Sequence, residues 1–411
     1  EYVLVNQGES PLWDGSKSAQ DLASIVNSVQ AFWGFNPLVR PYFFLNVIAQ
    51  GNAGLEHDHS TVLLANSWQM RYREEYINWL ALVTHEFFHA WNVRRLRPAA
   101  FKEYDYEREA YSHELWLAEG LTSYYDNLLL LRSGLITVNE YFTLLANEIH
   151  EYETTPGRSI EPVEQSSFDA WIKQYKPDAN SVNSGVSYYR QGALIGFVLD
   201  QAIRGQTNGH SSLDTVMREM YRLYGPQGSL GSTYPRGAFE DVVERVAGNP
   251  VRIRLEQLLT TTTSPDVDQA LDWYGLYLQR APAREAAVLS GKSPPAGFGL
   301  TWNKESAELI VENVLRGSTG AAAGILPADE LLAIDRTRVT KRNMDDRMQR
   351  LRPGETAELL MVRHGTLLTL DVIAQEALPD RYEILVLPEL NKHQKERIGS
   401  WLGVPLKFAR N

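Results

Sequence analysis

The most restrictive feature of the sequence is the run His85-Glu86-Phe87-Phe88-His89, in which two histidines lie four residues apart. Residues four apart share one face of a helix, so both imidazoles can point to the same place. A zinc ion bound by two imidazoles requires that arrangement, with each nitrogen about 2.0–2.1 Å from the metal. Glu86 is placed to take a proton from a metal-activated water, as the general base of a metallopeptidase does. We therefore predict a helix that carries two zinc ligands and a base.

A short pattern of this kind also occurs by chance in helices whose histidines are simply packed. The neighbouring apolar residues, at steps of three and four, are Tyr76, Leu80, Val83, Phe87 and Ala90. This periodicity predicts a mostly buried helix. A buried helix with a glutamate between two histidines needs a partner for these polar groups, and a metal ion provides one.

The segment from Leu115 to Asp126 contains candidates for the remaining parts of the site. A catalytic zinc takes three protein ligands and leaves one position for water. Glu119 lies in an apolar helical run, where an unpaired carboxylate is costly, so we predict that it is the third ligand of one Zn²⁺ per chain. Asp126 follows seven residues later on the same helix face. We predict that it accepts a hydrogen bond from a ligating histidine, the alternative being a solvated helix position.

Residues 51–60 join two predicted strands, at 42–48 and 61–65, and contain Gly54 and Glu56. Glycine beside a strand lets the backbone approach a ligand closely. The alternative is a polar hairpin loop, which is the commoner meaning of such a segment.

Tyr188 and Tyr189 begin a predicted helix at 188–205. A tyrosine hydroxyl at this place could donate to the oxyanion of a tetrahedral intermediate. The alternative is that the two tyrosines belong to the core or its rim.

The pattern of elements divides the 411 residues into parts. We predict a first domain at 1–282, with a β lobe over about 1–70 and a helical lobe over about 71–282. Further helices are predicted at 18–33, 137–152, 211–224, 237–247 and 251–261. A linker rich in Pro and Ala near 281–296 leads to a small β-rich domain at 293–378. Its expected elements are strands at 299–302, 309–314, 330–334, 358–362 and 367–373 and a helix near 343–350. Residues 379–411 are expected to be a tail without a clear fold.

Composition excludes several classes of protein. The net charge of −11 argues against a general nucleic-acid binder. The absence of cysteine excludes disulfides and thiolate zinc ligands. No apolar run is long enough for a membrane span. The chain begins at Glu1 and shows no signal peptide, so we expect a soluble fragment or processed product. The sequence leaves its compartment open between the bacterial cytoplasm and periplasm.

The runs 84–92 and 116–126 closely resemble the glycyl aminopeptidase family, which is related to the thermolysin-like zinc aminopeptidases. The resemblance implies an α+β fold: a thermolysin-like zinc peptidase domain, with a small β-sheet lobe and a mostly helical lobe, followed by a β-rich PDZ domain. It implies that His85, His89 and Glu119 bind zinc and that Glu86 is the general base. Members of the family also carry a β-rich domain before the catalytic domain, and we expect that this chain begins after it.

Two shorter matches imply further roles. Residues 53–57, Ala-Gly-Leu-Glu-His, resemble the Gly-x-Met-Glu-Asn substrate motif, whose glutamate binds the substrate α-ammonium; that role falls to Glu56, beside Gly54. Residues 189–192 resemble the Tyr-x-Lys-Gly motif, whose tyrosine stabilises the transition state; that role falls to Tyr189. The sequence departs from both motifs, with Ala53 for Gly, His57 for Asn and Gln191 for Lys, and Tyr188 competes with Tyr189.

Residues 297–300 resemble the carboxylate-binding loop of a PDZ domain, and residues 323–335 resemble its most recognisable strand and turn. The loop consists of Gly297, Phe298, Gly299 and Leu300. The predicted ligand of this domain is a peptide or a protein C-terminus.

These observations predict a zinc aminopeptidase that acts on peptides, with small first residues such as Gly or Ala suggested by the family. Two alternatives remain open. One is a zinc endopeptidase on the same centre. The other is a PDZ-type peptide-binding protein with an inactive peptidase half.

Overall fold

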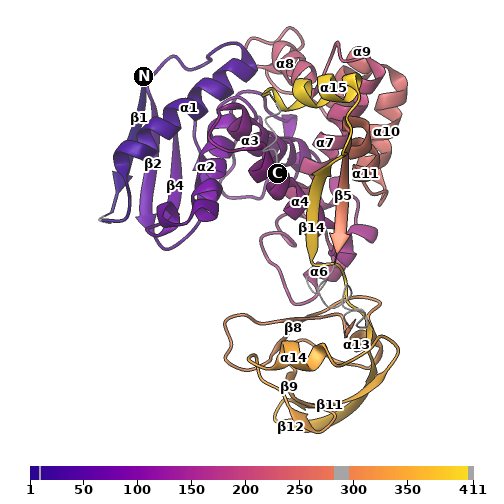
Figure 1. Cartoon of the computed structure of the whole chain (residues 1–411). Coiled ribbons are helices and arrows are strands. Elements are labelled where there is room, and N and C mark those ends of the chain that lie inside the picture. Colours follow the sequence, from indigo (N-terminus) through magenta and orange to yellow (C-terminus); the bar gives the residue numbers. More distant parts are fainter. Residues whose placement is uncertain (9–10, 282–295, 406–411) are drawn as a thin grey trace.

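A computed structural model gives the structure of the protein and describes residues 1–8, 11–281 and 296–405 (Figure 1). The chain begins with a four-stranded sheet in the order β1-β2-β4-β3. Its strands are β1 (Tyr2–Gln7), β2 (Tyr42–Ala49), β3 (Ala53–Glu56) and β4 (Ser60–Asn66). β1 and β4 run parallel to β2, and β3 is antiparallel to β4 at the edge. The predicted strands at 42–48 and 61–65 are therefore confirmed.

β1 and β3 were not expected as strands. β3 replaces the polar hairpin loop considered for residues 51–60, and it is only four residues long. Both strands exist through pairing with β2 or β4, and pairing of this kind is not visible in local sequence. As a result Gly54 and Glu56 lie on an edge strand.

The helix α2 (Arg73–Phe88) packs against β3 and β4, and the helix α1 (Gly15–Trp33) packs against α2. The side chain of Asp14 caps the start of α1 by accepting a hydrogen bond from the backbone N–H of Lys17. The helix ends at Gly34, whose φ of +78° suits glycine. The ring of Phe87 in α2 packs on the buried rings of Tyr42 and Phe44, with centroid distances of 5.2 and 5.3 Å. These contacts fix the α2 helix, which carries the His-Glu-x-x-His run, relative to the sheet.

The helical lobe follows, and the predicted helices at 137–152, 188–205, 211–224, 237–247 and 251–261 are all present. Its α-helices are α3 (Leu121–Arg132), α4 (Val138–Glu153), α5 (Val163–Phe168), α6 (Ser181–Ser184), α7 (Tyr188–Gln206), α8 (Leu213–Tyr224), α9 (Ala238–Ala247), α10 (Asn249–Thr260) and α11 (Val267–Tyr274). Short 3₁₀ turns η1 (Gln69–Arg71), η2 (Ala99–Phe101) and η4 (Pro156–Ser159) and a π-helical turn, η3 (Trp116–Gly120), connect them. α7 runs through the middle of this lobe and contacts η3, α3 and α5.

Residues 296–376 form a second domain, which we call the β-rich domain, with its own hydrophobic core (Figure 1). Its strands are β6 (Ala296–Gly297), β7 (Leu300–Trp302), β8 (Val311–Val314), β9 (Glu330–Ile334), β10 (Thr337–Arg338), β11 (Thr356–Arg363), β12 (Thr366–Ile373) and β13 (Gln375–Glu376). Its helices are α13 (Thr319–Ala322) and α14 (Met344–Met348). Every strand and the helix near 343–350 expected here are found. The predicted linker falls mostly on residues 282–295, outside the described residues.

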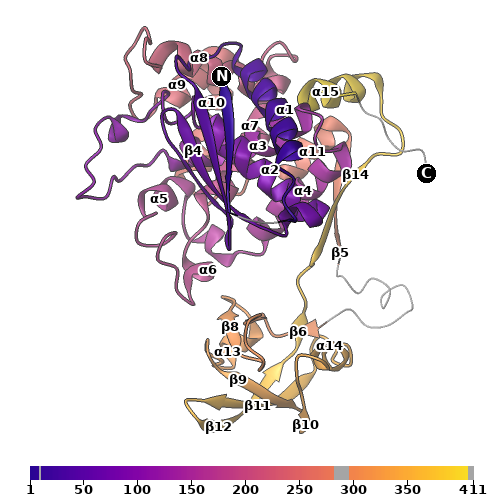
Figure 2. The same ribbon diagram turned by 90° about the vertical axis from the view of Figure 1, so that its left-hand side faces the viewer.

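The expectation that residues 379–411 form a separate tail is wrong for the part of the segment that the structure describes. β14 (Arg381–Val386) pairs antiparallel with β5 (Leu276–Ala281), so the chain returns beside the strand by which it left (Figures 1 and 2). α15 (Lys392–Leu402) then packs on the helical lobe through three fully buried side chains, Ile398, Trp401 and Leu402. The β-rich domain is thus inserted between two paired strands of the first domain.

The two domains also touch directly. Asn183 of α6, which is 6% exposed, donates a hydrogen bond to the carbonyl of Val314 at 2.8 Å and accepts one from the backbone N–H of Arg316 at 2.7 Å. α6 belongs to the segment that precedes α7. None of the helices in the described part of the chain has the length and apolar character needed to cross a bilayer.

Candidate metal centre

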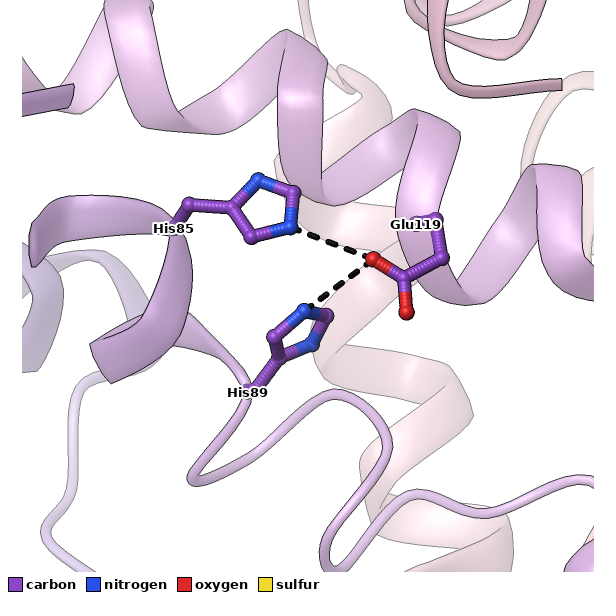
Figure 3. Close-up of side chains that lie close together, drawn as sticks. All are labelled: His85, His89 and Glu119. Carbon is purple, nitrogen blue, oxygen red and sulfur yellow. Dashed lines mark hydrogen bonds and ion pairs between the residues drawn. The ribbon is translucent and has the colours of Figure 1, made fainter. Parts of the chain in front are cut away.

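His85 and His89 lie at the end of α2 and direct their rings toward Glu119 (Figure 3). The Nε2 atoms of His85 and His89 lie 3.1 and 3.2 Å from the same carboxylate oxygen, Glu119 Oε2. Both histidines are buried, with 9% and 2% of their surface exposed. The structure therefore brings together the three residues that the sequence singled out as zinc ligands.

The position of Glu119 follows from an irregular turn of helix. Trp116–Gly120 forms a π-helical turn, in which the N–H of Leu121 donates to the carbonyl of Trp116. Such turns are rare and are frequently found at functional sites. The turn lies against α7, where a Cβ added to Gly120 would come within 2.6 Å of the Cα of Gly192. Close backbone contact between two glycines thus fixes the turn that presents Glu119.

Each histidine is oriented through its second ring nitrogen. Asp126 Oδ2 lies 3.1 Å from His85 Nδ1, which is the contact expected from its spacing. His89 Nδ1 lies 2.8 Å from the backbone carbonyl of Asn92. Because a carbonyl only accepts, Nδ1 of His89 carries the hydrogen, and a neutral His89 has a bare Nε2 toward Glu119. Asn92 in turn donates to the carbonyls of Leu117 and Ala118, at 3.1 and 3.2 Å, which ties it to the turn before Glu119.

In the metal-free chain the two histidines hold their protons firmly, whereas Glu119 is ionised. Burial opposes a charge on His89, but Glu119 outweighs it and raises the pKa of His89 to about 9. Burial likewise opposes a charge on His85, and hydrogen bonds from its Nδ1 to Asp126 and from its Nε2 to Glu119 raise its pKa. Burial alone would raise the pKa of Glu119, yet the two imidazoles hold it well below the usual range. Two imidazole nitrogens and one carboxylate, in a buried place that favours balanced charge, fit a zinc ion.

Glu86 lies beside this group and is 5% exposed. Its Oε2 is buried without a hydrogen-bond partner among the described residues. Burial raises the pKa of Glu86 to about 7, against the opposing charges of His89 and His85. Gly54 of β3 approaches this carboxylate so closely that an added Cβ would lie 2.2 Å from Glu86 Oε1. The glycine is thus required by the close passage of the edge strand past Glu86.

Glu56, two residues further along β3, is partly buried near Glu86 and His89. One polar atom from each of the three lies within 4.8 Å of the others. Glu56 and Glu119 also line a cavity of about 510 Å³, whose wall includes the aromatic side chains of Tyr104 and Trp171. Glu56 therefore lies where the metal centre meets an open cavity.

The two tyrosines at the start of α7 occupy different positions. Tyr188 is fully buried, whereas Tyr189 is partly exposed and its ring centroid lies 6.3 Å from that of His85. Burial and the nearby Glu119 carboxylate both raise the pKa of Tyr189, so its hydroxyl keeps its hydrogen. Of the two candidates, Tyr189 is the one beside the metal centre.

The predicted PDZ loop lies elsewhere. Gly297, Phe298, Gly299 and Leu300 line a groove of about 250 Å³ in the β-rich domain, together with residues of α14 such as Met344 and Met348. Figure 1 shows this domain standing away from the sheet and the helical lobe. The loop therefore has no part in the metal centre.

Two contributors to the site were missed by the sequence reasoning. The Asn92 carbonyl that orients His89 is a backbone group, which leaves no side-chain signal. The hydroxyl of Tyr175 lies 3.3 Å from that of Tyr189, but Tyr175 belongs to a segment without regular structure, and no motif marks it.

Comparison with known proteins identifies peptidases that are similar to this chain. Residues 78–195 match the model of the M61 glycyl aminopeptidase family, as the resemblance of the two runs suggested. The solved structure of an aminopeptidase N family protein from Idiomarina loihiensis is 30% identical, covers 97% of this chain and 68% of that chain, and has a TM-score of 0.87. No curated protein matches in a sequence search.

Two more distant structures also match. An M1 zinc metallopeptidase from Deinococcus radiodurans is 16% identical over 64% of this chain and 48% of that chain, with a TM-score of 0.41. A serine endoprotease from Yersinia pestis is 22% identical over 23% of this chain and 34% of that chain, with a TM-score of 0.20. Both scores are too low to support an argument about this chain.

Proposed function

The chain belongs to the aminopeptidase N family of peptidases, the family of its Idiomarina loihiensis relative, and we propose that it is a zinc-dependent aminopeptidase. The observation that carries the proposal is the convergence of His85 Nε2 and His89 Nε2 on Glu119 Oε2, at 3.1 and 3.2 Å. Two imidazole nitrogens and a carboxylate are a ligand set of catalytic zinc. The buried carboxylate of Glu86 beside them supplies the base.

Each residue of the site has a separate role in amide hydrolysis. Zinc held by His85, His89 and Glu119 would polarise the scissile carbonyl and acidify the attacking water. Glu86 takes a proton from that water and gives it to the leaving amine. Tyr189 donates its hydroxyl hydrogen to the oxyanion of the tetrahedral intermediate.

Glu56 makes the enzyme an aminopeptidase in this proposal. Its carboxylate pairs with the free α-ammonium of the substrate, at the rim of the cavity that it shares with Glu119. Gly54 lets the edge strand pass close to Glu86 without displacing it. Peptides are then shortened one residue at a time from the amino end. A preference for Gly or Ala as the first residue follows from the family resemblance.

Metal analysis and a panel of aminoacyl substrates test the proposal together. We expect one zinc ion per chain, cleavage of substrates with a free amino group, and little cleavage of N-acetylated peptides. Equal rates on free and N-acetylated peptides would favour the endopeptidase alternative. Protein that is purified without chelators and contains almost no zinc would contradict the metal centre.

Two matched variants separate metal binding from proton transfer. Glu119→Gln removes a ligand charge and is expected to lose zinc and activity together. Glu86→Gln is expected to keep its zinc and lose most of its turnover. Loss of zinc in both variants, or full activity in Glu86→Gln, would reject the assignment of roles.

We also propose that the β-rich domain is a PDZ domain whose groove binds a peptide C-terminus. β7 is paired with β8 alone among the described strands, so one of its edges is free beside the groove lined by Phe298 and Met348. An extended peptide can add to such an edge. A library of C-terminal peptides should bind the full chain, and amidation of the terminal carboxylate should weaken binding; equal binding of amidated peptides would contradict a carboxylate-binding loop.

A further inference from the structure

Three tyrosine hydroxyls meet next to the metal centre, and only one of the three belongs to the proposed catalytic machinery. The hydroxyl of Tyr188 donates to that of Tyr175 at 3.2 Å. The hydroxyl of Tyr175 lies 3.3 Å from that of Tyr189. Tyr175 is therefore the middle member of a row of hydroxyls that ends at Tyr189.

Either hydroxyl can be the donor between Tyr175 and Tyr189, and a count of hydrogens shows which order serves the reaction. A tyrosine hydroxyl has one hydrogen to donate and an oxygen that accepts. Because Tyr188 gives its hydrogen to Tyr175, the hydrogen of Tyr175 is available for the oxygen of Tyr189. The hydrogen of Tyr189 then remains free for the substrate. If Tyr189 instead donated its only hydroxyl hydrogen to Tyr175, it could not donate to an oxyanion.

The first member of the row has a fixed position. Tyr188 is fully buried, and its ring stacks on that of Tyr189 at a centroid distance of 4.7 Å. Hydrogen bonds in a row also polarise one another, so a hydroxyl that accepts one becomes a better donor. Tyr189 should thus gain both an orientation and donor strength from Tyr175.

Tyr175 itself is held from outside the active site. It is 58% exposed and lies on the segment between α5 and α7, but its backbone N–H donates to the carbonyl of buried Ala170 at 3.1 Å. Two residues earlier, Lys173 forms an ion pair with buried Glu161. Further along the segment, Asn183 is hydrogen-bonded to the β-rich domain. The position of the exposed tyrosine is therefore set by several anchors.

We propose that Tyr175 is a positioning residue that orients the hydroxyl of Tyr189, so that its hydrogen points to the reacting carbonyl. The inference rests on the proposed aminopeptidase function and adds to it a residue that acts through another. Tyr175 also lines the cavity that Glu56 and Glu119 share, and replacing it by Phe keeps the ring there while it removes the hydroxyl. Its loss should lower kcat and leave KM almost unchanged.

A double-mutant cycle tests this, with kcat and KM measured on alanine p-nitroanilide for the zinc-loaded full chain. Tyr189→Phe should lower kcat by about 10²- to 10³-fold, the effect of removing an oxyanion donor. Tyr175→Phe should lower kcat by about threefold to tenfold, which is the range of one net hydrogen bond. The double variant should be no slower than Tyr189→Phe alone, because Tyr175 then has nothing to orient. Tyr72→Phe is the matched control and should have the kcat of the wild type, because Tyr72 is 56% exposed and lies at the N-terminal end of α2, opposite the histidines.

The outcomes distinguish this inference from the proposed function. Wild-type kcat in Tyr175→Phe, or a double variant slowed by the product of the two single effects, would overturn the positioning role and leave the role of Tyr189 intact. Full kcat in Tyr189→Phe would overturn both. Zinc content and unfolding midpoint, measured for each variant, should equal those of the wild type; a loss of kcat that tracks either quantity would also overturn the inference.

Discussion

Replacing Glu86 by Gln should make the metal-free protein more stable while it makes the enzyme inactive. Glu86 is 5% exposed and its Oε2 has no hydrogen-bond partner among the described residues. Burial raises its pKa from 4.5 to about 7. At about 1.4 kcal/mol for each pH unit, this difference corresponds to a destabilisation of about 3 kcal/mol when the group is ionised. Glutamine has nearly the same shape and no charge, so it should remove that cost.

The size of the effect depends on pH. The folded, metal-free chain keeps a proton on Glu86 up to about pH 7, whereas the unfolded chain releases it near 4.5. Stability therefore falls as the pH rises between these values, and the full penalty is present above about 7. Glu86→Gln should be more stable than the wild type by about 3 kcal/mol at pH 8.5 and by less than about 1 kcal/mol at pH 5.

Urea unfolding of the metal-free wild type and variant at these two pH values measures the difference, and turnover of the zinc-loaded proteins completes the comparison. Turnover of Glu86→Gln should fall by about 10²- to 10⁴-fold, as expected for a general base. The control is Glu75→Gln, in the exposed first turn of the same helix. It should change the free energy of unfolding by only about 0.5 kcal/mol. An advantage that is absent at pH 8.5, or equal at both pH values, would refute the argument from a buried carboxylate.

Four other predictions concern the metal centre and helix α15. Zinc affinity should rise with pH up to about pH 9, because protons on His85 and His89 compete with the metal. Calorimetry in buffers of different ionisation enthalpy should show that zinc binding at pH 7.5 releases protons. Binding without proton release would contradict the raised pKa values. The same shift means that in the metal-free chain the stabilisation from His89 is complete below about pH 6.5 and is lost as the pH rises through about 9, which unfolding midpoints should follow. Asp126→Asn should weaken zinc binding by about 10- to 100-fold, because Asp126 orients His85; chelator competition measures it, and unchanged affinity would reject the role. Trp401→Ala should destabilise the first domain by about 3–5 kcal/mol, because its buried ring stacks on Tyr274 at 4.5 Å; urea unfolding measures it, and a neutral result would mean that α15 is dispensable.

Local patterns in the sequence identified the residues that meet at the metal centre. The four-residue spacing of His85 and His89, the apolar surroundings of Glu119 and the seven-residue step to Asp126 are all properties of helices, in which neighbours in space are near in sequence. The same reasoning located most helices of the first domain and every strand expected in the β-rich domain. The roles of these residues, as ligands, base and orienting group, stay predictions that the experiments above test.

Tertiary structure alone decided which distant segments pair and which side chains face the site. β1 and β3 exist because they pair with β2 and β4, and residues 381–402 belong to the first domain because β14 pairs with β5 and Trp401 enters its core. The choice of Tyr189 over Tyr188, and the approach of Tyr175, also depend on how α7 and the preceding segment pack. Helix periodicity is written within about four residues, but strand pairing and packing join residues far apart in the chain, so a single sequence shows the first and not the second.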